Sequence, residues 1–599
     1  MDIPTDSPQE EKRGWLGDSL ASHRTYTAFF DMRTAWIKWT EDQAYTSSVL
    51  RPEGTITSTV PCIFGPGLCL NDPRGQSKST SILTGVAWGS ILPQLSAFTA
   101  AYSKDVRYAA RLAEAAARYT GLLHSYTNNA THPFPQLLNI SSIEDHYNEA
   151  GPGWPASSFG DWCPVTGHGC SSVSALLNSV YYILDLDGSL ALHRIGGTNS
   201  TSPSEAEMAQ WIEEARNSFT SAFLHNITVA PADPGTNASS NITGLAFRDL
   251  YPAHVTHHGS QNVPPRAQAE AAAGMGVMES VLNDTEAQSH RAALGDMLAA
   301  LVVNQSTVYD AQQTGGVLDM AHLGRSLVSF GRPDAAVSLL STDGPTSFYH
   351  MAASTGTLWA HPGGSDGDGG KCSSHSHIMQ GGSVGEAVFG LGGIRPPFLR
   401  QAIPNMVTLN ERQVLLAPVP WLPGMPFGAA AWRTLAGVAS TRWAVTGDEV
   451  EIDEGGDTTV FSNWSVWVNV TVPSGSGVGL DSAQVQIMVP RSAERNSTCL
   501  WECGPGQPTA FESTEISFGS TASYRRITAI APSGPVAAAD VQRPECTVLW
   551  RSGVTEPPFA VGVSKIDWSP AMPGYFMFPA INVTLVSGGY SFFACPCAS

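Results

Sequence analysis

The sequence predicts an all-α domain followed by an antiparallel β-sandwich domain. Over the first two thirds of the chain, apolar residues recur at helical spacing in segments separated by long connections rich in glycine, proline and serine. After about residue 398 the apolar period changes from 3.6 to 2, which is typical of half-buried strands. A chain of 599 residues also exceeds the size of one compact core. We therefore expect a helical domain at residues 1–397 and a β-sandwich at residues 398–599.

Residues 203–224 show the helical pattern most clearly. Ser202 is a natural N-cap, and Pro203 suits the first helical position. The apolar residues that follow at helical spacing are Met208, Trp211, Ile212, Ala215, Phe219 and Phe223. Similar patterns predict helices near 18–42, 90–102, 104–125, 172–186, 265–282, 286–303, 319–330, 333–341 and 382–391. Because no strand pattern stands out between them, the first domain is predicted to be all-α.

Residues 464–472 give the clearest strand pattern. Alternate residues are apolar, and Asn469 is among the residues that fall on the outward face. Further strands are predicted near 443–452, 484–490, 558–563 and 580–594, with turn residues between them. Several short antiparallel strands of this kind indicate a sandwich of two sheets.

The charge balance and the hydropathy exclude several classes of partner. The formal net charge is -20, which argues against nucleic acid or an anionic membrane as the main partner. No run of about 18 apolar residues occurs, so we expect no membrane span.

Sequons and cysteines indicate the secretory route. Asn-x-Ser/Thr sequons exceed random expectation and occur at Asn129, Asn139, Asn199, Asn226, Asn237, Asn241, Asn283, Asn304, Asn463, Asn469, Asn496 and Asn582. Most of the ten cysteines form close pairs in the sequence, namely Cys62 and Cys69, Cys163 and Cys170, Cys499 and Cys503, and Cys595 and Cys597. Their spacing does not repeat a zinc pattern. This favours disulfides of undetermined connectivity over a reduced protein with scattered thiols.

The densest group of candidate catalytic residues is the segment Asp6–Asp18, which reads DSPQEEKRGWLGD. Glycoside hydrolysis needs a carboxylic acid to protonate the leaving oxygen and a second carboxylate elsewhere. It also needs carboxylates that hold sugar hydroxyls and aromatic rings that pack on the sugar. By composition alone, the same segment could be a solvated acidic turn before a capped helix.

The segment resembles the signature of the α-L-rhamnosidases of glycoside hydrolase family 78, Asp-Cys-Pro-Gln-Arg-Glu-Arg-x-Gly-Trp-x-Gly-Asp. This resemblance implies that Glu11 is the general acid. It implies that Asp6 and Asp18 hold sugar hydroxyls and that Trp15 is the tryptophan of the motif. It also implies an inverting enzyme that releases terminal α-L-rhamnose from glycosides or polysaccharides, without a cofactor or metal.

Further short matches follow in the order of the family. They are 86–89 with Trp88, 159–162 with Asp161 and Trp162, 351–359 with Trp359, 374–377 with His377, 382–386 and 393–396. The resemblance implies that the tryptophans, Asp161 and His377 contact substrate, and that the helical domain is an (α/α)6-type toroid. The last match resembles the family's link into a C-terminal β-domain.

Other interpretations of these residues stay open. Trp88 and Trp359 could be core residues of a helical barrel. His375 and His377 could form a metal pair, although no third ligand is visible and the resemblance implies a sugar contact for His377. The glycine-rich segment 362–371 resembles a calcium loop but lacks the closing glutamate, so no metal is assigned to it.

Two positions depart from the family. The family carries its presumed general base directly after the Leu-Trp pair, where this chain has Ala360. Loss of that base costs about 10²- to 10⁴-fold in rate, or more. Asp366 and Asp368 are poor substitutes, because a glycine-rich loop does not hold a base in a fixed position. Glu10 stands where the family has an arginine, so an anion replaces a cation that grips the sugar.

The signature begins at residue 6, whereas the family places helices and β-domains before it, and the N-terminus has no signal-peptide pattern. We therefore expect an N-terminally truncated relative of a secreted protein, with a toroid that lacks its first helices. Two functions follow as hypotheses. The chain is an α-L-rhamnosidase-like hydrolase, or it is a catalytically impaired relative that binds sugar without cleaving it because of Ala360.

Overall fold

The structure is a computed structural model with two compact units, which are described separately. One unit comprises Met1–Ala387 with Gln401–Leu409, and the other comprises Val388–Arg400 with Asn410–Ser599. Apart from the C-terminal strands named below, the structure describes residues 4–6, 12–50, 54, 56, 59–60, 86–103, 105–139, 175–198, 203–229, 242–248, 267–278, 285–304, 316, 321–344, 347–359 and 374–395.

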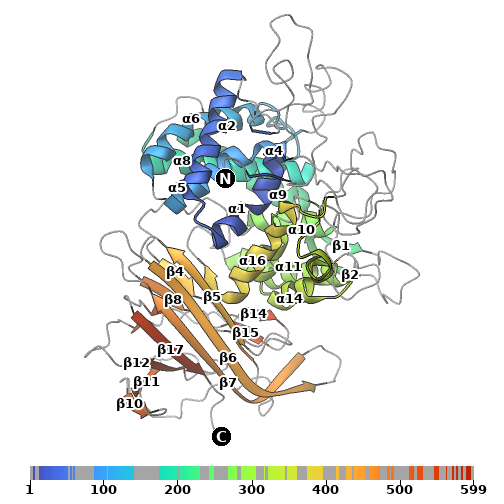
Figure 1. Ribbon diagram of the computed structural model, residues 1–599. Coiled ribbons are helices and arrows are strands. Elements are labelled where there is room, and N and C mark those ends of the chain that lie inside the picture. The colour runs from blue at the N-terminus through green and yellow to red at the C-terminus, as the bar shows by residue number, and fades with distance from the viewer. Residues whose placement is uncertain are drawn as a thin grey trace, which may run out of the picture. The chain divides into compact units, whose positions relative to one another are not determined.

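Six of the described helices form a closed inner ring in the first unit, as their contacts show. They are α1 (Leu16–Phe29), α5 (Ile91–Ser103), α8 (Ala175–Gly196), α10 (Ala267–Met278), α13 (Leu323–Ser329) and α16 (Gly381–Gly392). Figure 1 labels α1, α5, α8, α10 and α16 among them. Each packs against the next in this order, and Gly324 of α13 lies directly against Ser383 of α16. The ring closes where Thr25 Oγ1 of α1 donates a hydrogen bond to Gly381 O at 2.7 Å.

Among the described residues, the inner ring runs without a gap from α1 to α16. The expectation that the toroid lacks its first helices stays a prediction. Helix α8 is buried around nearly its whole circumference, as a helix enclosed by other helices must be.

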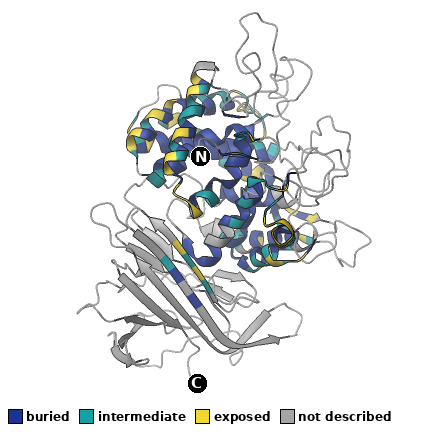
Figure 2. Cartoon of the chain, in the orientation of Figure 1, coloured by how far each residue is buried: buried dark blue, intermediate teal, exposed yellow. Residues whose placement is uncertain are grey.

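An outer layer of amphipathic helices covers the ring. It consists of α2 (Arg33–Leu50), α6 (Val106–His124), α9 (Glu205–Phe223), α11 (Thr285–Asn304) and α14 (Pro333–Ser341). Exposed and buried residues alternate along these helices, as Figure 2 shows for the helices nearest the viewer. Helix α6 is typical, because the Asp105 side chain caps it by accepting from Tyr108 N at 2.9 Å, and Tyr108 then turns inward and is fully buried.

Shorter elements complete the first unit. They are α4 (Val86–Gly89), α15 (Phe348–Thr355), the 3₁₀ turn η4 (Ile378–Gln380), and the strands β1 (Leu224–Val229) and β2 (Ile242–Phe247). The two strands pair as an antiparallel hairpin that packs on α11. The prediction of an unbroken all-α domain was therefore wrong at this hairpin.

A buried ion pair joins the inner helix α8 to the outer helix α9. Arg216 Nη2 lies 2.6 Å from Asp187 Oδ2, and their side chains are 19% and 1% exposed. Burial raises the pKa of Asp187 to about 6, against the opposing pull of Arg216. We expect Arg216→Ala to cost about 3–5 kcal/mol in the free energy of unfolding at pH 7.5, because it leaves a buried carboxylate without its cation.

Urea unfolding would measure this cost, with Arg194→Ala as a matched control. Arg194 also joins α8 to α9, through a 2.6 Å contact with Glu205. This pair is much more accessible to solvent, because the two side chains are 34% and 42% exposed. Its loss is expected to cost about 1 kcal/mol or less. Equal losses of unfolding free energy in the two variants would contradict the idea that burial makes the Arg216–Asp187 pair more important than the Arg194–Glu205 pair.

The second unit contains a seven-stranded antiparallel sheet in the order β10–β11–β12–β17–β7–β6–β5. Its strands are β5 (Phe427–Thr434), β6 (Gly437–Ile452), β7 (Thr458–Val472), β10 (Glu512–Ser517), β11 (Ser523–Ala529), β12 (Cys546–Arg551) and β17 (Gly588–Ala594). In the β5–β6 pair, Gly428 lies opposite Trp443, and a Cβ there would come within 2.5 Å of the buried indole.

Smaller sheets hold the other strands of this unit. They are β3 (Ile394–Arg395), β4 (Gln413–Leu416), β8 (Ser482–Val485), β9 (Met488–Pro490), β13 (Val561–Gly562), β14 (Ser569–Met572), β15 (Tyr575–Met577) and β16 (Asn582–Val583). Strands were therefore correctly predicted in this part of the chain. A face-to-face sandwich of two sheets stays a prediction.

Candidate active site

The two ends of the acidic motif are held by separate structural elements. Asp6 is 1% exposed, and its carboxylate Oδ1 accepts from Arg13 N at 2.8 Å while its own backbone N–H donates to Arg13 O at 2.9 Å. Asp18 lies in the first turn of α1 and is 2% exposed. A carboxylate in that position is favoured by the positive end of the helix dipole.

Asp18 meets His377 across the closure of the ring. His377 Nδ1 lies 3.2 Å from Asp18 Oδ1, and both side chains are nearly buried. Burial lowers the pKa of His377 to about 4, so the ring is neutral near pH 7. The contact is therefore between a carboxylate and a neutral imidazole. It places a titratable base and an acid side by side at the start of α1.

The segment 374–380 ties three distant parts of the sequence together. His377 N donates to Leu358 O at 2.9 Å, and Ile378 N donates to Asp6 O at 3.3 Å. The structure thus brings Asp6, Asp18, His377 and the 358–359 strip into one neighbourhood. The carboxylates and the neutral imidazole can accept hydrogen bonds from the hydroxyl groups of a sugar, and an indole can pack against its ring.

The tryptophans occupy two separate pairings. Trp15 is half-buried and meets Trp88 edge to face, with ring centroids 5.7 Å apart. Trp88 is only 2% exposed, so it supports Trp15 and offers almost no surface to a ligand. Trp359 stacks on His375 with centroids 4.7 Å apart, and its Nε1 donates to Thr355 Oγ1 at 2.7 Å.

Gly17 makes the tryptophan pair fit. A Cβ at this position would lie 2.5 Å from the Trp88 indole, closer than real Cβ contacts come. We expect Gly17→Ala to destabilise the unit by about 1–3 kcal/mol through overpacking, despite the better helix propensity of alanine. Chemical denaturation followed by tryptophan fluorescence would measure the loss in the free energy of unfolding. Gly381→Ala, whose Cβ would meet its nearest neighbour only at 4.0 Å, is the control, and equal losses in both would contradict the proposed clash.

Several predicted residues lie outside the described part of the chain. These are Glu11, Asp161 and Trp162, together with Glu10 and Ala360. All the cysteines except Cys546 lie there too. Within the described residues, no group of three or more His, Cys, Asp and Glu side chains is placed to hold a metal, and no helix is long and apolar enough to cross a membrane.

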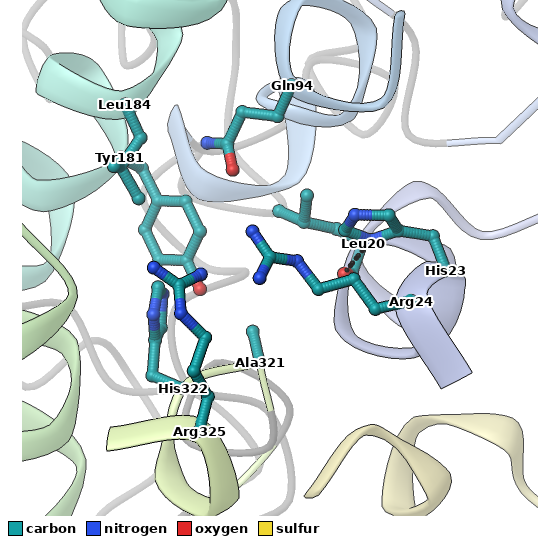
Figure 3. Close-up of a pocket in the computed structure, with 9 residues that line it drawn as sticks. All are labelled: Leu20, His23, Arg24, Gln94, Tyr181, Leu184, Ala321, His322 and Arg325. Atoms are coloured by element: carbon teal, nitrogen blue, oxygen red, sulfur yellow. Dashed lines mark hydrogen bonds between the residues drawn. The ribbon is translucent and has the colours of Figure 1, made fainter. Parts of the chain in front are cut away.

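Sequence reasoning missed a pocket inside the ring of helices that is lined mainly by polar and charged side chains (Figure 3). Its lining residues are Leu20, His23, Arg24, Gln94, Tyr181, Leu184, Ala321, His322 and Arg325. They come from α1, α5, α8 and the start of α13. The available signal was the placement of charged residues within helices that are otherwise apolar, such as Arg325 in α13.

A comparison with known protein families shows to which family the chain belongs. Residues 1–389 match the family described as the bacterial alpha-L-rhamnosidase 6 hairpin glycosidase domain. The chain belongs to this family. The resemblance of its sequence motifs to the rhamnosidases is thereby confirmed. No curated protein sequence matches the chain.

Solved rhamnosidase structures share the fold. The alpha-L-rhamnosidase from Dictyoglumus thermophilum has a TM-score of 0.57 at 15% identity, over 100% of this chain and 47% of that one. The native alfa-L-rhamnosidase from Aspergillus terreus has a TM-score of 0.52 at 16% identity, over 82% of this chain and 45% of that one. The chain spans about half the length of these rhamnosidases.

Proposed function

We propose that the chain is an inverting glycoside hydrolase that releases terminal α-L-rhamnose from a glycoside or polysaccharide. The observation that carries this proposal is the meeting of Asp6, Asp18 and His377 at the start of α1 in a member of the rhamnosidase family. Carboxylates and a neutral imidazole in one place can hold several sugar hydroxyls at fixed positions.

The roles of the residues follow from the motif and the contacts. Glu11, between Asp6 and Asp18 in the sequence, protonates the leaving oxygen. Asp6 and Asp18 accept hydrogen bonds from sugar hydroxyls, and His377 adds a further polar contact. Trp15 and Trp359 pack against the sugar, with Asp161 and Trp162 completing the pocket, while Trp88 backs Trp15.

Hydrolysis of an aryl α-L-rhamnoside by the full chain tests the proposal, with folding confirmed by circular dichroism. Proton NMR of the first-formed sugar would show whether the anomeric configuration is inverted. Glu11→Gln is expected to lower the rate by about 10²- to 10⁴-fold. Glu10→Gln is the matched control, since it makes the same change at the neighbouring position. Equal effects of the two variants, or no hydrolysis by a folded parent chain, would count against the proposal.

Ala360 favours a second candidate function, a sugar-binding protein that does not cleave. Alanine neither accepts a proton nor orients a water molecule, so an inverting mechanism would lack its base. Calorimetric titration with rhamnose in parallel with the hydrolysis assay separates the two functions. Binding without any release of aglycone supports the second.

We also propose that a helical catalytic domain at 1–397 and a β-sandwich domain at 398–599 make up a glycoprotein of the secretory route. Asn129 and Asn226, both within sequons, are exposed and accessible to glycosylation. Secretion from a eukaryotic host and a loss of mass on endoglycosidase treatment are the expected results. An unglycosylated product that is retained in the cytoplasm would contradict this.

A further inference from the structure

His375 is the exposed member of a ring stack in the candidate active site. Trp359, the residue on which its imidazole stacks, is only 9% exposed. The two ring centroids are 4.7 Å apart, and the ring planes differ by 28°. One face of the imidazole therefore lies on the indole, and the other face is turned toward solvent.

The indole of Trp359 is fixed by further contacts. Its Nε1 donates to Thr355 Oγ1 at 2.7 Å, and the ring of His350 meets it edge to face, with centroids 5.9 Å apart. Its backbone N–H donates to Met351 Sδ at 3.3 Å. Because these contacts and the stacked imidazole leave little of the indole exposed, most of the accessible surface of the pair belongs to His375.

The backbone that carries this imidazole is fixed as well. The carbonyl oxygen of His375 accepts from Thr357 Oγ1, and two residues later His377 N donates to Leu358 O at 2.9 Å. The segments 357–358 and 375–377 thus hold each other in place on both sides of the stack. A ring that is already held in position loses little conformational entropy when it binds a ligand.

Exposure increases from Asp18 to His377 and then to His375. The side chains of Asp18 and His377 are 3% and 10% exposed, and they lie where the terminal sugar is proposed to bind. The Cα atoms of His377 and His375 are at most about 7 Å apart, because two residues cannot span more. An enzyme that removes a terminal unit holds it at the buried end of the site, since the rest of the substrate must extend into solvent. His375 therefore lies on the side of the leaving group.

We propose that the outer face of His375, stacked on Trp359, binds the group to which the rhamnose is attached and favours an aromatic aglycone over an aliphatic one. A flat aryl group covers a ring face more completely than an alkyl group does, and stacked aromatic pairs are favourable beyond the area they bury. This inference rests on the proposed function, because it takes the terminal rhamnose to be held by Asp18 and His377.

Calorimetric titration of the full chain tests the preference with two probes that share the sugar, 4-nitrophenyl α-L-rhamnoside and methyl α-L-rhamnoside. The chain carries Glu11→Gln, so that binding is measured without cleavage. We expect the aryl glycoside to bind about 2- to 10-fold more tightly than the methyl glycoside. His375→Ala should abolish this difference and leave the Kd of the methyl glycoside unchanged. His375→Phe, which keeps a flat ring, should retain the difference.

His350→Ala is the matched control, since it removes the other histidine that meets the Trp359 ring, and it should keep the preference for the aryl glycoside. A preference that survives His375→Ala, or that is lost equally in His375→Ala and His350→Ala, would show that the imidazole only supports the indole and would overturn the proposal. Equal Kd values for the two glycosides would overturn the proposal while leaving the proposed function intact. No binding of either glycoside by the folded chain would contradict the proposed function, and this inference with it.

Discussion

Replacing Ala360 with glutamate is expected to increase the hydrolysis of an aryl α-L-rhamnoside by about 10²- to 10⁴-fold over the parent chain. Inversion requires a carboxylate that removes a proton from the attacking water, on the face of the sugar opposite the general acid. Ala360 directly follows Trp359, and Leu358 O accepts from His377 N at 2.9 Å. The backbone two residues before position 360 is therefore tied to the segment that carries His377, the residue that lies against Asp18.

The rate constant kcat for the aryl glycoside would be compared in three variants. Ala360→Gln has the size of glutamate without its basicity and is the matched control. Combining Ala360→Glu with Glu11→Gln should remove the gain, since both proton transfers are needed. If Ala360→Glu is no faster than Ala360→Gln, position 360 does not supply the base in this chain, and activity has to depend on another carboxylate.

Lowering the pH from 7 to 5 should destabilise the helical unit through three buried histidines. Burial lowers the pKa of His23 and of His322 to about 3 and that of His377 to about 4, against 6.5 in an exposed ring. Between pH 6.5 and these values, the unfolded chain binds protons that the folded chain does not. The stabilising effect of each neutral ring is complete above pH 6.5 and is lost as the pH falls, by about 2 kcal/mol per ring at pH 5.

Two buried aspartates act in the opposite direction. Burial raises the pKa of Asp187 to about 6, and it raises that of Asp185 well above its usual range even though Ser90 and Gln94 donate to it. A raised carboxyl pKa means that the folded chain binds the extra proton, so these two groups favour folding as the pH falls through that range. The net loss is therefore expected to be smaller than the sum over the three histidines.

Urea unfolding at pH 7 and pH 5 isolates the histidine effect when the parent is compared with His23→Phe. The variant should show a smaller difference between the two pH values, by about 2 kcal/mol, because one titrating ring is removed while the aspartates stay. His132→Phe, at a half-exposed ring, is the control. An unchanged pH dependence in His23→Phe would contradict the assignment.

Helix bounds were predicted well where a local residue signal, such as proline, marks the end of the helical pattern. The predicted helix 333–341 matches α14 in both bounds, because Pro333 fixes its first turn. The helix predicted at 203–224 begins later, at Glu205. There Ser204 and Glu207 form a capping box, which satisfies more backbone groups than Ser202 could alone. Residues 18–42 were predicted as one helix because no glycine or proline marks the break at Phe30.

The same distinction between local and long-range signals applies to the candidate site. Asp6, Asp18 and Trp15 were found from the sequence because their spacing within one short segment carries the motif. The contact of Asp18 with His377 could not be derived from spacing, since it depends on how α16 returns to α1. The pocket was missed for a related reason. Arg24 and Arg325 read as ordinary charged helix residues until the ring turns them inward.

The closure of the ring also sets an order of events during synthesis. Thr25 and Gly381, whose hydrogen bond joins α1 to α16, are 356 positions apart in the chain. At about 5–20 residues per second, the ribosome needs roughly 20–70 s to deliver the second after the first. Throughout that time the acidic, tryptophan-bearing segment has no Gly381, His377 or Leu358 to meet. The first part of the described unit to leave the ribosome is thus the last to form its tertiary contacts. It forms them only after the residues between Thr25 and Gly381 have been translated.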